Sequence, residues 1–173
     1  GRMNHNSLKD LLIFGTGIGD EGFTEIAAVL GSQPQLERLF LDNNNIGRDR
    51  CIALGNALSR WPHSNKLEAL YIDNNAIDDE SLQALVSGMM NCRSLKHLYL
   101  GGNRSITADG LRSLSPLFQS EAHSLEKLSL YGINFGDDGA IALAEGLRGN
   151  NSLTELTFHV ETAGITAVGW SAF

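Results

Sequence analysis

The hydrophobic residues of this chain recur in a segment of the form Leu-x-x-Leu-x-Leu, with Ile or Phe also used at the last position. The segment begins six times, at Leu8, Leu36, Leu67, Leu95, Leu125 and Leu153. Successive starts lie 28, 31, 28, 30 and 28 residues apart. A fixed period of this length predicts a stacked array of strand-plus-helix units that folds as one body.

The segment itself reads as a short strand. In the second repeat Leu39 and Leu41 alternate with polar or aromatic neighbours, which predicts one apolar face and one open face. The same alternation gives the inward pairs Leu11/Ile13, Leu70/Ile72, Leu98/Leu100, Leu128/Leu130 and Leu156/Phe158. Because each strand returns through a helix, we expect neighbouring strands to be parallel.

The second half of each repeat has the period of an amphipathic helix. Its four-residue spacing is seen in Gly22-Ile26-Leu30, Arg50-Leu54-Leu58, Ser81-Leu85-Met89 and Gly139-Leu143-Leu147. Acidic residues stand at the expected first turns, as in 78–80 and 137–138, where they can cap free N–H groups and oppose the helix dipole. Helices are wider than strands, so we expect the stack to bend with the strands inside the curve.

Asn44, Asn75 and Asn103 occupy the same step between strand and helix. A buried turn has backbone groups that need partners, and an asparagine amide offers two donors and an acceptor. The sequence therefore predicts an asparagine ladder that joins neighbouring turns. The ladder is interrupted at Thr16, Ile133 and Glu161.

The run from Asn134 to Leu147 resembles the helical half of a leucine-rich repeat of the ribonuclease-inhibitor type, and 36–46 and 67–77 resemble its strand half. The resemblance implies an α/β solenoid, a right-handed horseshoe arc with a parallel sheet on the concave face and helices on the convex face. It extends from residue 7 to residue 173, over about six repeats with an incomplete or atypical last one. We expect residues 1–6 to be a tail or tag remnant, and the chain to be a piece of a longer array or a C-terminal fragment.

Relatives of this type include ribonuclease inhibitors, innate-immune sensor arrays, the activating protein of the Ran GTPase and tropomodulin. Most hold another macromolecule, so the resemblance implies a protein–protein interaction scaffold and not an enzyme. Two alternatives stay open. One is a regulator of an enzyme, such as a GTPase-activating array, and the other is the sensor or autoinhibitory region of a multidomain receptor. The alternating Trp-bearing long repeats of ribonuclease inhibitor are missing, which argues against ribonuclease as the partner.

Composition limits the classes of partner that the protein is expected to bind. A net charge of −7 argues against nucleic acid and favours a neutral or basic partner. No stretch approaches 18 apolar residues, so no membrane span is expected. The chain has two cysteines, Cys51 and Cys92, and no cysteine-rich cap, which favours a reducing, cytoplasmic location.

One motif imitates a dinucleotide-binding fingerprint. Residues 17–22 read G-x-G-x-x-G between an expected strand and helix, and Asp42 ends the next strand. The repeat explains the motif better, because Gly22 recurs as Gly110 and Gly139. Acidic residues at 20 and 21 would also lie where a pyrophosphate should bind. We therefore expect no cofactor.

Other candidate chemistry is weak. No cysteine or histidine spacing is typical of a zinc site, and no nucleophile has an evident base, so we expect neither a metal nor catalysis. Cys51 follows Arg50 near a helix start, which leaves two interpretations: a thiol of lowered pKa or a packed thiol.

The open strand positions form three rows. The middle row contains Leu12, Phe40, Tyr71, Tyr99, Ser129 and Thr157. The row toward the start of the strands contains Asp10, Arg38, Ala69, His97, Lys127 and Glu155, and the row at their end contains Phe14, Asp42, Asp73, Gly101, Tyr131 and His159. Parallel strands lie about 4.8 Å apart, so an aromatic stripe is predicted along the middle row, extended by Leu12, Phe14 and Tyr131.

Such a stripe is typical of a binding surface, although aromatic residues also simply suit strands and could contact another part of a longer protein. Asp42 and Asp73 are like charges on adjacent strands, which repel. A basic group of a partner would relieve this, or Arg38 or Lys127 could do so internally. The predicted binding residues are Arg38, Phe40, Asp42, Tyr71, Asp73, His97, Tyr99 and Tyr131, and the predicted partner is a protein or peptide with a basic group.

Overall fold

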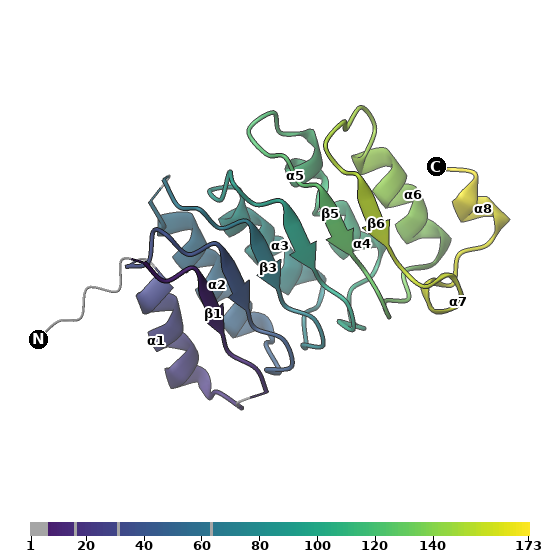
Figure 1. Cartoon of the computed structure of the whole chain (residues 1–173). Helices are drawn as coiled ribbons and strands as arrows, with labels where there is room; N and C mark the ends of the chain where they lie inside the picture. Colours follow the sequence, from purple (N-terminus) through teal and green to yellow (C-terminus); the bar gives the residue numbers. More distant parts are fainter. Residues whose placement is uncertain (1–6, 16, 31, 63) are drawn as a thin grey trace, which may run out of the picture.

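The computed structural model describes residues 7–15, 17–30, 32–62 and 64–173, and the backbone alone of Asp20 and Val160. The expected tail at 1–6 and the ladder interruption at Thr16 lie outside the described residues. In the described part, strands and helices alternate along the chain, with the strands on one side and the helices behind them (Figure 1).

A single sheet of six parallel strands runs through the array in chain order. The strands have three residues each: β1 (Asp10–Leu12), β2 (Arg38–Phe40), β3 (Ala69–Tyr71), β4 (His97–Tyr99), β5 (Lys127–Ser129) and β6 (Glu155–Thr157). Equivalent residues of successive repeats are paired, as in Leu39 with Leu70. The predicted parallel strands and their register are confirmed.

The helices follow the strands on the other face. The long ones are α1 (Asp20–Leu30), α2 (Arg48–Arg60), α3 (Asp79–Met89) and α6 (Gly136–Gly146). The fourth repeat has two short helices, α4 (Ala108–Arg112) and α5 (Ser115–Gln119), and the last has α7 (Val160–Ala163) and α8 (Ala167–Trp170). Pro116 lies in the first turn of α5, where its missing N–H and its ring prevent a continuous helix. No helix in the described segments is both long and apolar enough to cross a membrane.

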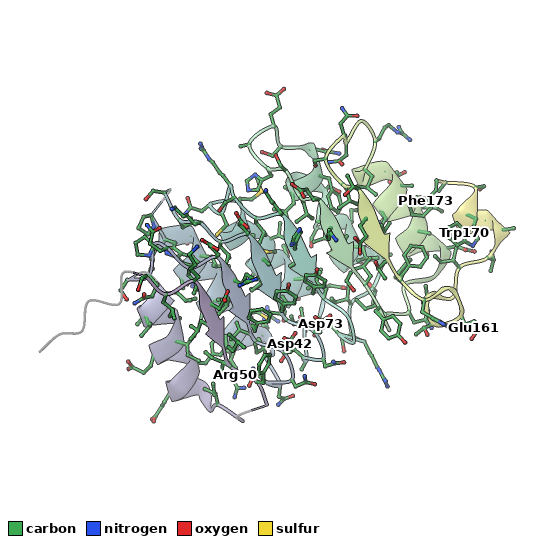
Figure 2. All side chains as sticks on the ribbon, viewed as in Figure 1. Asp42, Arg50, Asp73, Glu161, Trp170 and Phe173 are labelled. Atoms are coloured by element: carbon green, nitrogen blue, oxygen red, sulfur yellow. The ribbon has the colours of Figure 1, made fainter. Side chains whose placement is uncertain are left out.

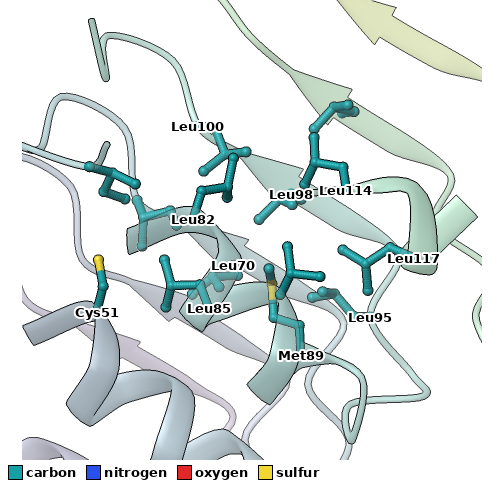
Figure 3. Packing of buried hydrophobic residues seen from close by; sticks show 14 of the residues in the cluster. Cys51, Leu70, Leu82, Leu85, Met89, Leu95, Leu98, Leu100, Leu114 and Leu117 are labelled. Atoms are coloured by element: carbon teal, nitrogen blue, oxygen red, sulfur yellow. The ribbon is translucent and has the colours of Figure 1, made fainter. Parts of the chain in front are cut away.

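The core lies between the sheet and the helices. Leu70, Leu98 and Leu100 from the strand segments meet Leu85 and Met89 of α3, and all five are fully buried (Figure 3). The equivalent leucines of the other central repeats are buried in the same way. Because each repeat can cover its apolar face only with its neighbour, this continuous core joins the repeats.

Helices α2 and α3 approach each other backbone to backbone. A Cβ atom built on Gly55 would lie 2.5 Å from the carbonyl oxygen of Ala84, and one on Gly88 would overlap the backbone of Gly55. No other residue type fits this distance without moving a helix. The glycines therefore fix the separation of the second and third repeats.

Asparagine side chains join the turns that follow the strands. The Asn75 amide nitrogen donates to the carbonyl oxygens of Leu41 and Ile72, at 3.0 Å each, and to that of Asp73, at 3.2 Å. Its oxygen accepts from the backbone nitrogens of Asn44, at 3.0 Å, and Ile46, at 2.9 Å.

Asn103 does the same one repeat later, accepting from the backbone nitrogens of Asn75 and Ile77. Asn44, 3% exposed, donates to Ile13 and Asp42. Each of these turns is thus bonded to the one before it.

The acidic residues at the helix starts have two different roles. Asp78 caps its own helix, since its carboxylate accepts from the Ser81 hydroxyl at 2.5 Å and the Ser81 nitrogen at 2.8 Å, and these bonds lower its pKa. Asp79 instead accepts from the nitrogen and hydroxyl of Thr107, at 2.7 Å each, and Asp137 bonds Thr166 likewise. The expectation that these two cap their own helices is therefore wrong. They reach the threonine that begins the next repeat's helix.

Candidate protein-binding face

The strand face is the side of the sheet that the helices leave uncovered, and it contains the three predicted rows. Strand pairing aligns Leu12, Phe40, Tyr71, Tyr99 and Ser129 in the middle row. The structure thus places five of the eight predicted residues in two groups on this face, the three central rings and the two aspartates.

The three central rings form an aromatic stack, which we define as Phe40, Tyr71 and Tyr99. Adjacent ring centroids are 4.3 Å apart in both pairs, with interplanar angles of 9° and 5°. Phe14 meets Phe40 edge-on at 6.0 Å. Since each ring covers its neighbour, the stacked rings are only half-exposed, and burial raises the pKa of Tyr71.

Tyr131 lies apart from the stack. It belongs to the row at the ends of the strands, is 60% exposed, and meets His159 edge-on at 6.1 Å. Ser129 follows Tyr99 in the middle row, so the stacking ends there.

The row at the start of the strands is self-neutralised. Arg38 donates to both oxygens of Asp10, at 2.5 and 2.7 Å, and this contact lowers the pKa of Asp10. Lys127 pairs with Glu155 at 2.7 Å. Between them lie His97, half-buried, and Ala69, which its larger neighbours cover so that it is 2% exposed and not open as expected.

These pairs bear on the internal way of relieving the repulsion between Asp42 and Asp73. Arg38 stands four residues before Asp42 on an extended strand, a distance of about 13 Å along the backbone. Its guanidinium is held at Asp10, and Lys127 is held at Glu155. Neither residue neutralises Asp42 or Asp73 from within the strand face.

Asp42 and Asp73 lie side by side, each two residues beyond the end of its strand, β2 or β3 (Figure 2). Asp42 Oδ1 accepts from the backbone nitrogen of Asp73 at 2.9 Å, and the backbone of Gly101 lies against the Asp73 carboxyl. Burial, followed by the charge of Asp42, raises the pKa of Asp73 to about 7. A Cβ on Gly101 would lie 2.7 Å from Asp73 Oδ1, so a glycine is needed beside this carboxyl.

The two carboxyls open onto a shallow hollow of about 490 Å³ at the ends of the strands. It is lined by Phe14, Asp42, Asn43, Asp73, Asn74, Gly101, Gly102, Arg104, Tyr131 and Gly132. The sequence did not identify Asn43, Asn74 or Arg104 as part of a site. Asn43 and Asn74 have φ of 59° and 52°, a left-handed conformation that asparagine tolerates, so the paired asparagines after each aspartate were the available signal.

Of the fingerprint-like glycines, Gly22 has a packing role, whereas a Cβ on Gly17 or Gly19 would meet nothing within 4 Å. A Cβ on Gly22 would lie 2.6 Å from Ile18 Cγ2, and one on Gly139 would lie 2.6 Å from the Cβ of Phe135. In each case the first helical turn rests on the apolar residue that precedes it by four. The repeat therefore accounts for Gly22, the last glycine of the motif.

Cys51 is fully buried, and burial raises its thiol pKa to about 12. The interpretation of a lowered pKa is therefore wrong, because Arg50 is directed elsewhere: its guanidinium donates to the Asn44 carbonyl at 3.1 Å. No group of three or more His, Cys, Asp or Glu in the described segments is arranged to hold a metal ion.

Comparison with known proteins agrees with this architecture. A family model described as Leucine Rich repeat matches residues 63–86 and 91–115. NACHT, LRR and PYD domains-containing protein 5 of Mus musculus is 32% identical over 143 residues, which is 83% of this chain and 12% of that protein. Ribonuclease inhibitor of Sus scrofa is 33% identical over 147 residues, 82% of this chain and 30% of the inhibitor. The chain thus spans a minor part of these relatives.

Among solved structures, the tropomodulin C-terminal domain of Caenorhabditis elegans has a TM-score of 0.59 at 14% identity, covering 99% of this chain and 83% of that one. The Leiomodin-1 Actin-Binding Site 2 has a TM-score of 0.58 at 15% identity, covering 98% and 78%. Identity this low speaks for the fold alone. With the six-stranded parallel sheet, the repeated leucines and the matched family model, the chain belongs to the leucine-rich-repeat proteins of the ribonuclease-inhibitor type.

Proposed function

We propose that this domain is a protein–protein interaction scaffold that holds a protein or peptide on its strand face without covalent chemistry. The observation that carries the proposal is the aromatic stack, three rings aligned at 4.3 Å on a sheet face that no helix covers. Buried aromatic anchors supply much of the energy in protein interfaces.

The stack is suited to binding because its rings are already ordered. Each ring is held by its neighbours at small interplanar angles, so little side-chain entropy is lost when a partner covers the remaining surface. Phe14, 49% exposed, and Tyr131, 60% exposed, add apolar surface at the two ends. A partner lying across the strands would meet both.

The relatives support a macromolecular partner. The Sus scrofa relative is by name an inhibitor of ribonuclease, and the leiomodin structure is by title an actin-binding site. Both cysteines of this chain are free and buried, which fits a reducing, intracellular setting.

The scaffold is better supported than the GTPase-activating alternative. That activity needs a loop arginine poised over a nucleotide. Arg48 is paired with Glu80, and Arg50 donates to the carbonyls of Asn44 and Asn45. Arg104 lines the hollow, beside the aspartates that a nucleotide's phosphates would avoid.

The test is site-specific photocrosslinking in a native cell extract. A photoreactive phenylalanine replaces Tyr99 in one variant and Gln83, exposed on α3, in a matched control. We expect a discrete crosslinked protein from position 99 that is absent from position 83. The variant Tyr71→Ala/Tyr99→Ala, used as unlabelled competitor, should compete at least tenfold less well than the unmodified chain. Equal competition by the two would contradict the proposal.

A further inference from the structure

We propose that the hollow at the ends of β2 to β4 receives one arginine side chain of the partner, and that its guanidinium displaces a proton shared by Asp42 and Asp73. The inference rests on the proposed function, since it assigns the chemistry of one contact on the strand face. It adds a named partner group and a dependence of binding on pH.

The two carboxyls are held together by the backbone. Asp42 Oδ1 is bonded to the Asp73 nitrogen, and the Gly101 backbone lies against Asp73 Oδ1, which a Cβ there would approach to 2.7 Å, so both carboxyls are confined. Below them, Asn75 and Asn103 bond the turns of adjacent repeats to each other. The repulsion of two ionised carboxylates therefore cannot be relieved by separation, and binding one proton is the alternative.

The charged groups around the pair do not remove this repulsion. Arg104 and Tyr131 line the same hollow, and Tyr71 lies in the adjacent row. In the part of the chain that the structure describes, no cation is ion-paired with Asp42 or Asp73. Because the pKa of Asp73 is about 7, the pair carries close to one proton at slightly acidic pH.

Arginine fits this site better than other cations. Its planar guanidinium has paired N–H groups that can donate to both carboxyls at once, whereas a lysine ammonium acts as a point charge. The guanidinium face can also lie on an aromatic ring, and Phe14 and Tyr131 both line the hollow. The glycines at 101 and 102 leave the floor between Asp73 and Tyr131 without side chains.

The test uses the probe peptide acetyl-Gly-Gly-Arg-Gly-Gly-amide, followed by NMR of the aspartate carboxyl carbons and backbone amides. The control peptide has citrulline, which keeps the shape and lacks the charge. At pH 8 we expect saturable shifts at Asp42, Asp73 and Gly101 with the arginine peptide only. From a pKa of about 7, binding at pH 6 should be roughly tenfold weaker, because the proton must first be displaced.

Two variants separate this mechanism from general charge effects. Asp73→Asn should abolish the shifts, while Asp138→Asn, the same change of charge on the exposed helix side, should leave them intact. The tenfold pH effect should also persist in His97→Gln/His159→Gln, which removes the two histidines of the strand rows. The inference would be overturned if the citrulline peptide bound as tightly as the arginine peptide or if the affinity were equal at pH 6 and pH 8. Full binding of the arginine peptide by Asp73→Asn would also overturn it.

The two proposals fail separately. If the arginine peptide does not bind as expected while the crosslink from position 99 still forms, only the arginine site is refuted. Peptide binding as expected, with competition unaffected by Tyr71→Ala/Tyr99→Ala, refutes the strand-face scaffold alone. Circular dichroism of every variant ensures that a loss of binding is compared between folded proteins.

Discussion

Two polar rows follow the strands only two residues apart, and they differ in how well their groups are satisfied. The asparagines at 44, 75 and 103 lie beneath the turns, and the amide oxygen and nitrogen of Asn75 are both bonded to backbone groups. The aspartates at 42 and 73 lie above, half-open, as adjacent like charges. Both rows are built by the same repeat.

The difference indicates which row serves the fold, and it is the reason for proposing the other row as a contact for a partner. A buried polar group that is fully bonded specifies the structure, and its removal leaves several backbone groups without partners. A half-open pair of like charges costs stability and gains from an added cation. The repeat thus supplies a row of asparagines that hold the turns together and, above it, a pair of aspartates whose like charges repel.

Among the variants that test this comparison, Asn75→Ala is expected to have the largest effect on stability. It removes five hydrogen bonds to backbone groups of two repeats, so we expect it to lower the free energy of unfolding by about 3–5 kcal/mol. Urea denaturation at pH 7 measures this. Asn56→Ala, at an exposed position of α2, is the control and should change stability by less than about 0.5 kcal/mol. Similar small effects for both would mean that the ladder is dispensable.

Tyr71→Ala comes next, since it removes the central ring of the stack and both of its stacked contacts. Each such pair contributes about 0.5–1.5 kcal/mol, so a loss of about 2 kcal/mol is expected. Tyr131→Ala, at a 60% exposed ring, should cost clearly less in the same denaturation experiment. If the order were reversed, the stack would not be the pre-ordered element that we describe.

Asp73→Asn should stabilise the protein at pH 8, on the order of 1 kcal/mol after allowance for solvent screening of a half-open group. The folded pKa, about 7, is raised above the ordinary value near 4, so the wild type is favoured at low pH and loses stability as pH rises from about 4 to about 7. Thermal unfolding of both proteins at pH 4 and pH 8 gives the comparison. The substitution Asp78→Asn weakens a helix cap and removes a carboxylate whose pKa is lowered, so it should destabilise the protein at pH 8.

The smallest effect is expected for Arg38→Gln. Its ion pair with Asp10 is exposed to solvent, and such pairs contribute little. We expect the melting temperature to be unchanged within error, and the apparent pKa of the Asp42–Asp73 pair in carboxyl NMR to be unchanged as well. A rise in that pKa on removing Arg38 would show that the arginine supports the aspartates after all.

The fold could be predicted from the sequence because it depends on period alone. Leu39 and Leu41 alternate with open positions, and the repeat length fixes which strand lies beside which, so the rows followed directly. The residues of each row could be predicted from the sequence, but the directions of the long side chains could not. Arg38 had Asp10 and Asp42 as possible partners, and only the packing of its side chain decides for Asp10.

The same limit applies to the acidic residues at the helix starts. Asp78 and Asp79 are adjacent and chemically identical, yet one caps its own helix and the other reaches Thr107 of the next repeat. The choice depends on the separation of neighbouring helices, which no local pattern contains. The hollow was missed for a related reason, because it is shaped by the left-handed backbone of Asn43 and Asn74 and by glycines of other repeats.

The contact of Gly55 with Gly88 has a mechanical consequence. Two helices that touch through their main chains have no compressible layer of side chains between them, so the second and third repeats behave as a rigid plate. Bending or twisting of the array under load would be absorbed elsewhere, above all in the last repeat, where the helices are four-residue pieces. Asp42 and Asp73 belong to these two repeats, so the spacing of their backbones is fixed by the same contact between the helices.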